Sequence, residues 1–457
     1  MKLKQVSIKK LHGYLNSKFD LDDDLALLVG INGGGKTSAL NAINWLIKLD
    51  TGKLATECYE KIELTFELDG KDYLYSAVQD KKTVIINLLD IQTGYSFKNL
   101  VIKLDHDTKG LKSLRVKNEQ FDIYSKVTPD ETEQETYNLI KSFPKPMNIG
   151  LDRTLILSDE GGTTVDEDIN TNQSHYGPNR LNPLQRVGRI LSREFTNHTN
   201  EILKLTRTLN ETIIMSTFDE VYTEEQLIDL MSQKPPSIEI LETLEKQIIS
   251  FLNENHNSNG REKKAQDSPE VNITEFNISQ YFTSLKRLLK DNPSEKSLEY
   301  AVNISHFSKV NKLINAFSTF EENSKLEIAP LEEFIAIIND FLVDSAKRLY
   351  FEKKTGQLKY DIIDSEKQIV ESGININTLS SGERQLLILF TYIKYRKEKL
   401  FMIDEPELSL HIKWQEDFLK AIYKFKKPDT QLIIATHSPE IIGVYKDKCK
   451  IFNPYFK

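Results

Sequence analysis

The chain has 457 residues, of which 39% are hydrophobic and 28% charged, with a formal net charge of −8. This length allows two or three domains, and the acidic balance gives no support for a large nucleic-acid-binding surface. The two cysteines, Cys58 and Cys449, lie far apart and exclude a CxxC metal hook and a disulfide framework. The sequence has no signal-peptide pattern and no apolar stretch of roughly 20 residues that could span a bilayer. We therefore expect a cytoplasmic protein with no membrane partner.

The first third of the chain predicts strands around a single helix. Residues 1–8 alternate like a strand, and residues 24–30 form a more apolar strand that leads into an amphipathic helix ending near Leu49. Short alternating segments between about 57 and 103 indicate an antiparallel sheet. Three further segments are an acidic loop or helix start at 130–135, a strand at 146–156 and a polar, flexible loop at 158–182.

The middle of the chain predicts helices, because apolar residues recur there every three or four positions. The polar segment 253–268 interrupts this pattern and is expected to be mobile. No periodic stretch is long enough to indicate an extended, rod-like coiled coil. The periodic segments are 184–209, 238–251, 281–289, 298–320 and 331–349.

The last hundred residues return to strands that alternate with helices. A helix is expected from Ser381, an apolar strand at 400–403, a second helix, and another strand at 431–436. This alternation predicts a parallel α/β core. We expect residues 1–180 and 351–457 to form one α/β domain, a mixed sheet with an antiparallel subdomain. Residues 181–350 would be an all-helical insertion into it.

The strongest single motif is the glycine-rich loop GINGGGKT, which fits G-x-x-x-x-G-K-[ST] between an apolar strand and a helix. Glycines allow consecutive backbone N–H groups to surround phosphates at the positive end of a helix. The pattern predicts that Lys36 lies between the β- and γ-phosphates of ATP and that the Thr37 hydroxyl binds Mg²⁺. The nucleotide contacts predicted in this loop are Asn32, Gly33, Gly34, Gly35, Lys36, Thr37 and Ser38.

The apolar strand LFMIDE ends in two acids, Asp404 and Glu405. A buried strand of a parallel sheet delivers such carboxylates to the sheet edge where ligands bind. Asp404 is predicted to hold Mg²⁺, and Glu405 to orient or deprotonate the attacking water. Alone, this pattern could equally mark a turn, but together with the glycine-rich loop it indicates nucleotide hydrolysis.

The third motif, LSSGERQ, precedes the predicted helix at Ser381. One interpretation is a helix N-cap box with Ser380 at the cap and Glu383 behind it. The other is a phosphate cradle formed by the helix start, with Ser380, Ser381, Gly382 and Glu383 as nucleotide contacts. The two are compatible. Because the glycine-rich loop already surrounds one side of the nucleotide, the second cradle is best used on the nucleotide of a facing copy.

Together, GINGGGKT, LSSGERQ, LFMIDEPELSLH and IIATHSP resemble the ATP-binding-cassette heads of the SMC and RecF type. The resemblance makes LSSGE the signature motif, Asp404 and Glu405 the Walker B acids, and residues 409–411 the D-loop. It implies that His437 is the switch histidine, a catalytic residue that contacts the γ-phosphate. It also implies an ATP-sandwich dimer, in which each site uses Lys36 of one head and residues 380–382 of the other.

The glutamine loop of that family is harder to assign. Gln79 lies in a predicted hairpin, which favours a surface glutamine over a nucleotide contact. The segment 148–153 resembles the strand that leads to this loop in the smaller defence ATPases, with Asp152 or Arg153 in place of glutamine. The sequence therefore does not identify the residue that couples the nucleotide to the helical insertion.

The layout also resembles stand-alone ATPase subunits of bacterial anti-phage systems, first the PARIS and Septu subunits and then the retron-associated ATPases. This resemblance implies a higher even oligomer such as a hexamer, a phage protein as trigger and a separately encoded nuclease as effector. The helical insertion would supply assembly contacts, or its helices would pack only on one another. The alternatives are a RecF-like DNA-repair clamp and a nucleotide-gated scaffold with very slow hydrolysis. The basic stretch 103–117 is either a local nucleic-acid contact or the solvated surface of a sheet.

Overall fold

The computed structural model describes residues 1–22, 24–105, 114–150, 182–218, 223, 235–258, 273–290 and 298–452. The chain divides into two compact units. The first, the head, comprises Met1–Ser192 and Phe334–Lys457, and the second, the helical unit, comprises Arg193–Glu333. The N- and C-terminal segments thus form one unit.

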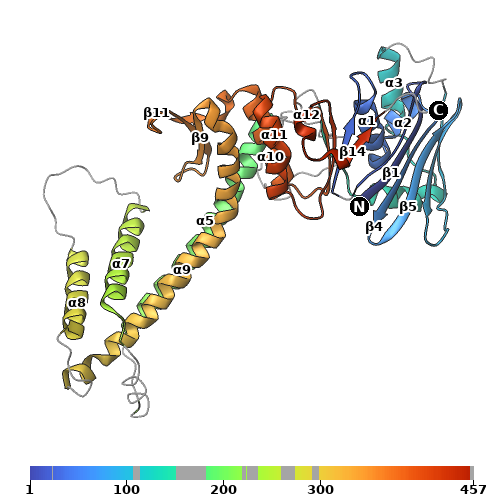
Figure 1. Ribbon diagram of the computed structural model, residues 1–457. Helices are drawn as coiled ribbons and strands as arrows, with labels where there is room; N and C mark the ends of the chain where they lie inside the picture. Colours follow the sequence, from blue (N-terminus) through green and yellow to red (C-terminus); the bar gives the residue numbers. More distant parts are fainter. Residues whose placement is uncertain are drawn as a thin grey trace, which may run out of the picture. The chain divides into compact units, whose positions relative to one another are not determined.

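The head contains a six-stranded antiparallel sheet in the order β2-β1-β4-β5-β6-β7, and α1 (Lys36–Lys48) packs against it (Figure 1). Its strands alternate buried and more exposed residues, as expected for a sheet with one covered face. The antiparallel sheet predicted over residues 57–103 is confirmed, with β1 and β2 as additional strands. The strands are β1 (Lys2–Leu11), β2 (Leu15–Asp20), β4 (Lys61–Leu68), β5 (Lys71–Gln79), β6 (Thr83–Asp90) and β7 (Leu100–Lys103).

A second sheet of the head is parallel throughout, in the order β14-β3-β13-β12-β8. Its central strands are buried on both faces, which explains their continuous apolar sequences. Alternate residues of these strands enter two different hydrophobic clusters, one shared with α1 and one with α10 and α11. The predicted parallel α/β core is confirmed. The elements are β3 (Leu25–Val29), β8 (Met147–Ile149), β12 (Leu400–Asp404), β13 (Gln431–Thr436), β14 (Cys449–Ile451), α10 (Ser381–Tyr395) and α11 (Ile412–Phe425).

A third, smaller sheet contains β9 (Lys347–Phe351), β10 (Leu358–Ile363) and β11 (Ile369–Asn375). The helix predicted over 331–349 is therefore wrong at its end, because β9 begins at Lys347. The chain turns there through Ala346, whose φ is 55°, and the Asn339 side chain bonds both the N–H and the C=O of Leu349. These bonds fix the exit from helix to strand.

The helical unit contains α7 (Ile238–Ser258) and α8 (Ile273–Lys290), together with α5 (Pro183–Thr217) from Arg193 onward and α9 (Leu298–Leu342) as far as Glu333. Residues 298–320 and 331–342, predicted as parts of separate helices, belong to one helix of 45 residues that contains Pro330. Such a helix is about 68 Å long at 1.5 Å per residue, longer than any periodic segment that the sequence indicated. α5 and α9 lie side by side in this unit (Figure 1), joined by His198 and Glu327 at 2.9 Å.

The remaining short elements lie in the head. The sheet-surface interpretation of residues 103–117 is wrong from Leu114 onward, where α3 begins. There Arg115 pairs with Glu119 and Lys117 with Glu57. Of the two interpretations of the acidic segment at 130–135, a loop or a helix start, the structure shows the helix start. The predicted loop at 158–182 lies almost entirely outside the described residues. These elements are α2 (Thr51–Thr56), α3 (Leu114–Tyr124), η2 (Glu131–Glu133), α4 (Gln134–Ser142), η3 (Val343–Ser345), η4 (Ile376–Thr378), α12 (Pro439–Ile442) and η5 (Lys446–Lys448).

Candidate functional site

The glycine-rich loop connects the end of β3 to the start of α1 at the C-terminal edge of the parallel sheet. Gly33 has φ 74° and Gly35 has φ 95°, a region that residues with a Cβ rarely adopt. Gly35 is the N-cap of α1 and provides no side-chain cap, which leaves the first helical N–H groups without a side-chain acceptor. A helix start of this kind attracts anions through its free N–H groups and its dipole.

Lys36, the first residue of α1, is only 4% exposed and points its ammonium back into the loop. Its Nζ donates to the carbonyls of Gly30 at 3.2 Å and Ile31 at 3.3 Å, and lies 2.5 Å from His437 Nε2. Burial lowers the pKa of Lys36, and the nearby carboxylates, Glu405 foremost, act in the opposite direction. The loop therefore holds a buried cation facing a group of acids.

Asp404 closes β12 and is 6% exposed. The Thr37 hydroxyl donates a hydrogen bond to its carboxylate, but Oδ1 is buried and has no hydrogen-bond partner among the described residues. Burial raises the pKa of Asp404, the bond from Thr37 opposes this, and the charge of Glu405 adds to it. An unpartnered buried carboxylate oxygen is costly unless a cation binds to it.

Glu405 follows at φ 48°, a left-handed conformation that costs a non-glycine residue roughly 1–3 kcal/mol. Its N–H donates to the Ala435 carbonyl at 2.8 Å, which ties the end of β12 to β13. Its Oε1 lies 3.5 Å from His437 Nε2. The strained backbone thus brings the second acid of the motif next to the histidine that follows β13.

The LSSGERQ motif forms the start of α10, and the N-cap interpretation is confirmed. The Ser380 N–H donates to Glu383 Oε2 at 2.7 Å, and the Glu383 N–H donates to Ser380 Oγ at 3.4 Å. The Glu383 carboxylate is also paired with Lys347 at 2.8 Å. Burial alone would raise the pKa of Glu383, but Lys347 and the Ser380 N–H hold it below its usual value. Its side chain is therefore engaged within its own head.

Gly382 has a structural role that sequence reasoning missed. A Cβ at this position would approach the Ser409 carbonyl oxygen more closely than the 3.0 Å below which real Cβ atoms are essentially never found. The neighbouring Gln385 donates from Nε2 to the Pro406 carbonyl at 3.2 Å. The start of α10 is therefore packed directly on the turn that follows Glu405, and only glycine permits this approach.

Two further polar side chains at the site were missed by sequence reasoning. Glu407 Oε1 accepts the backbone N–H of His437 at 2.5 Å, and Gln415 accepts the Ser438 hydroxyl at 2.7 Å. The signal for Glu407 was a third acid two residues beyond the Walker B pair. Gln415 lies within an amphipathic helix, and its sequence offers no comparable signal.

The family comparison matches residues 1–442 to the AAA ATPase domain. The chain belongs to this AAA ATPase domain family. Two solved structures that it resembles are an Smc head domain of Pyrococcus furiosus with an extended coiled coil, bound to the C-terminal domain of ScpA, and the SMC head domain of Thermotoga maritima. The Pyrococcus furiosus structure is 14% identical, its match covers 96% of this chain and 91% of that structure, and the TM-score is 0.32. The Thermotoga maritima structure is 11% identical, its match covers 97% of this chain and 91% of that structure, and the TM-score is 0.33.

An ATPase of this family implies a nucleotide, usually with Mg²⁺, and the residues present fit both. No group of three or more His, Cys, Asp or Glu side chains within the described ranges could hold a metal ion alone. The adjacent Thr37 hydroxyl and Asp404 carboxylate instead match the way Mg²⁺ binds, through one or two protein oxygens together with water and substrate phosphates. The unpartnered Oδ1 of Asp404 is the atom that such an ion would satisfy.

Gln79 is buried rather than on the surface, so that expectation is wrong. Its Nε2 donates to the carbonyls of Leu54 and Glu57, and its Oε1 accepts the Tyr59 N–H. These bonds make it a structural anchor at the end of β5. Asp152 and Arg153 lie outside the described residues. Among the helices that the structure describes, none is long and apolar enough to cross a membrane.

Proposed function

We propose that this chain binds ATP with Mg²⁺ at the glycine-rich loop and hydrolyses it in a site completed by a second head. The supporting observation is the convergence of Lys36, Glu405 and His437 from three separate elements. His437 lies 2.5 Å from the lysine and 3.5 Å from the glutamate. Around the imidazole, the cation can bind phosphate and the acid can activate water, while the imidazole itself can contact the γ-phosphate.

Each of these side chains has a defined task in the reaction. Lys36 exchanges the carbonyls of Gly30 and Ile31 for the β- and γ-phosphate oxygens of ATP. Thr37 and Asp404 would hold Mg²⁺, which when bound would supply positive charge beside the phosphates. Glu405 orients the attacking water and accepts its proton, and His437 donates to the γ-phosphate.

The second half of the site would come from residues 380–382 of a facing head. Support comes from exposed apolar side chains beside the motifs of this head. Ile31 in the glycine-rich loop is 69% exposed, Leu408 in the turn after Glu405 is 44% exposed, and Ile412 at the start of α11 is 59% exposed. Exposed apolar side chains next to the motifs of a polar site favour a surface that a partner covers.

Mixing two inactive variants tests the shared site. Lys36→Ala removes the phosphate-binding side of a head, and Ser380→Arg blocks its cradle side. Each variant alone is expected to be inactive, whereas the mixture regains part of the ATP turnover because a dimer of unlike subunits keeps one intact site. Full turnover by Ser380→Arg alone, or no recovery in the mixture at any ratio, would contradict the shared site.

At a finer level, we propose that the chain is the sensor and scaffold of an anti-phage system that controls a separately encoded nuclease. The motif resemblance supports this role, as do the exposed Leu203 and Leu326 of the helical unit, which offer contacts for assembly into a higher even oligomer. Phage-challenge assays with the whole operon would test this role. Lys36→Ala should remove protection, and binding of the nuclease to the chain should no longer depend on ATP. Unchanged protection, or tight and salt-dependent DNA binding by the chain alone, would favour the DNA-repair clamp instead.

A further inference from the structure

The turn after Glu405, defined here as the D-loop turn (residues 405–411), is anchored at its base and exposed at its tip. The Leu408 N–H donates to the Glu405 carbonyl at 3.1 Å, and the Leu410 N–H donates to the Glu407 carbonyl at 3.0 Å. Ser409 at the tip has φ 71°, and Leu408 next to it is exposed. The Ser409 carbonyl packs against Gly382, so a surface that presses on Leu408 would move this tip together with its packing, and the backbone bonds would carry the displacement to the base.

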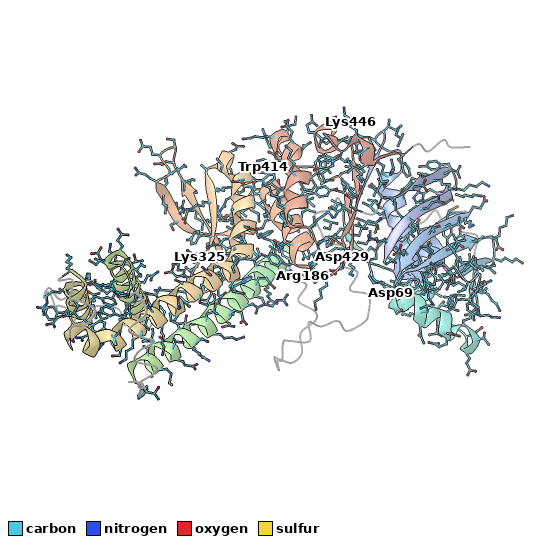
Figure 2. All side chains as sticks on the ribbon, turned by 60° about the horizontal axis from the view of Figure 1, so that its bottom comes forward. Asp69, Arg186, Lys325, Trp414, Asp429 and Lys446 are labelled. Atoms are coloured by element: carbon cyan, nitrogen blue, oxygen red, sulfur yellow. The ribbon has the colours of Figure 1, made fainter. Side chains whose placement is uncertain are left out.

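Gln415, in the first turn of α11 beside the Trp414 labelled in Figure 2, connects this turn to another part of the site. Its Nε2 donates to the Leu410 carbonyl at 2.9 Å and, at 3.4 Å, to the Glu407 carbonyl. Its Oε1 accepts the hydroxyl proton of Ser438 at 2.7 Å. The orientation of the amide is fixed, because backbone carbonyls only accept hydrogen bonds. One side chain thus bridges the D-loop turn and the residue that follows His437.

The segment around His437 is held from both sides. Its own N–H is bonded to the Glu407 carboxylate at 2.5 Å. Ser438, which is buried, caps α12 by accepting the Ile441 N–H at 3.1 Å, and its hydroxyl also lies 3.0 Å from Glu440. The single hydroxyl proton can serve either Gln415 or Glu440, and the bond to Gln415 is the shorter. Movement of the D-loop turn therefore reaches the His437 backbone through two links, the Glu407 carboxylate and the Gln415 amide.

We propose that Gln415 is a positioning residue that transmits displacement of the D-loop turn to His437, so that contact with a second head sets the imidazole for turnover. The inference rests on the proposed function, because the second head supplies the displacement. Gln415 acts through Ser438 and the backbone of the turn. Removing its amide takes one hydrogen-bond partner from the carbonyls of Glu407 and Leu410 and from the Ser438 hydroxyl. This loss weakens the hydrogen-bond network that connects the turn to Ser438.

Gln415→Leu tests the proposal, because leucine keeps much of the side-chain volume and loses all three bonds. Turnover number is expected to fall about 10- to 100-fold, the range typical of residues that orient a catalytic group. Affinity for a non-hydrolysable ATP analogue should stay within about twofold of the wild type, since Gln415 does not touch the glycine-rich loop. Gln134→Leu, at an exposed glutamine in the first turn of α4, serves as the matched control and should leave turnover unchanged.

A double variant separates positioning from a general structural defect. If Gln415 acts through His437, Gln415→Leu combined with His437→Ala should turn over no more slowly than His437→Ala alone. Independent, multiplying losses, or a Gln415→Leu defect that appears as lost ATP affinity with an unchanged turnover number, would overturn the proposal. A wild-type chain without any ATP turnover would overturn the proposed function itself, and the two failures are therefore distinguishable.

Discussion

Replacing Gly382 with alanine tests whether the start of α10 is packed on the D-loop turn as tightly as the structure indicates. The added Cβ would overlap the Ser409 carbonyl oxygen and lie 3.4 Å from the Trp414 ring, so backbone must move. Overpacking of this kind costs about 1–3 kcal/mol, partly offset by the roughly 0.5–1 kcal/mol that alanine gains over glycine in a helix. We expect a net loss of about 1–2 kcal/mol.

Gly188→Ala is the matched control, because this glycine is also helical and an added Cβ would meet only Ile376 Cδ1 at 3.8 Å. It should stabilise the chain by about 0.5–1 kcal/mol. Calorimetry without nucleotide should therefore place the Tm of Gly382→Ala below the wild type and that of Gly188→Ala slightly above it, about 2–3 °C apart in total. ATP turnover should fall only in Gly382→Ala. Equal stability of the two variants, with unchanged turnover, would refute the packing argument.

Three other variants test separate features: Lys36 and Asp404 belong to the site, whereas Lys145 lies elsewhere in the head, where its ammonium donates to the carbonyls of Ile47 and Ile140. Lys36→Ala should abolish ATP binding in a calorimetric titration, and normal affinity would remove the glycine-rich loop from the site. Asp404→Asn should raise the Tm without ligand while abolishing Mg²⁺-dependent turnover. Because burial raises the pKa of Asp404, its protonated form favours folding, and the wild type should lose this contribution as pH rises through that pKa, whereas the variant should not. Burial lowers the pKa of Lys145 to about 8, so folding should gain stability as pH rises from about 8 toward 10.5. Denaturant titrations of Lys145→Met should show a smaller gain, and an identical pH profile would refute this.

Much of the head could be predicted from the sequence because its signals are local. The alternation of β4 and β6 and the continuous apolar sequence of β12 each reflect the faces that those strands bury. The glycine-rich loop needs positive φ at Gly33 and Gly35, and glycine is the residue type that adopts this conformation readily. In such segments the local residue pattern alone decides the conformation.

Other features depend on contacts between distant segments, which a single sequence does not reveal. Pro330 separated two apolar segments that nevertheless belong to the single helix α9, because packing overrides the local preference. The end of that helix depends on Asn339 bonding Leu349, and the close approach of Gly382 to Ser409 joins residues far apart in the chain. Gln415 was missed for the same reason, since its partners become neighbours only after folding.

The most direct test of the shared site is the mass of Glu405→Gln with and without ATP and Mg²⁺. Loss of the proton acceptor should leave ATP bound and unhydrolysed, so the proposed site predicts a nucleotide-dependent doubling of mass. Adding Ser380→Arg to the same chain should prevent the doubling while ATP still binds at Lys36. A Glu405→Gln chain that binds ATP at unchanged mass, or one that doubles equally well with Ser380→Arg, would contradict a nucleotide held between two heads.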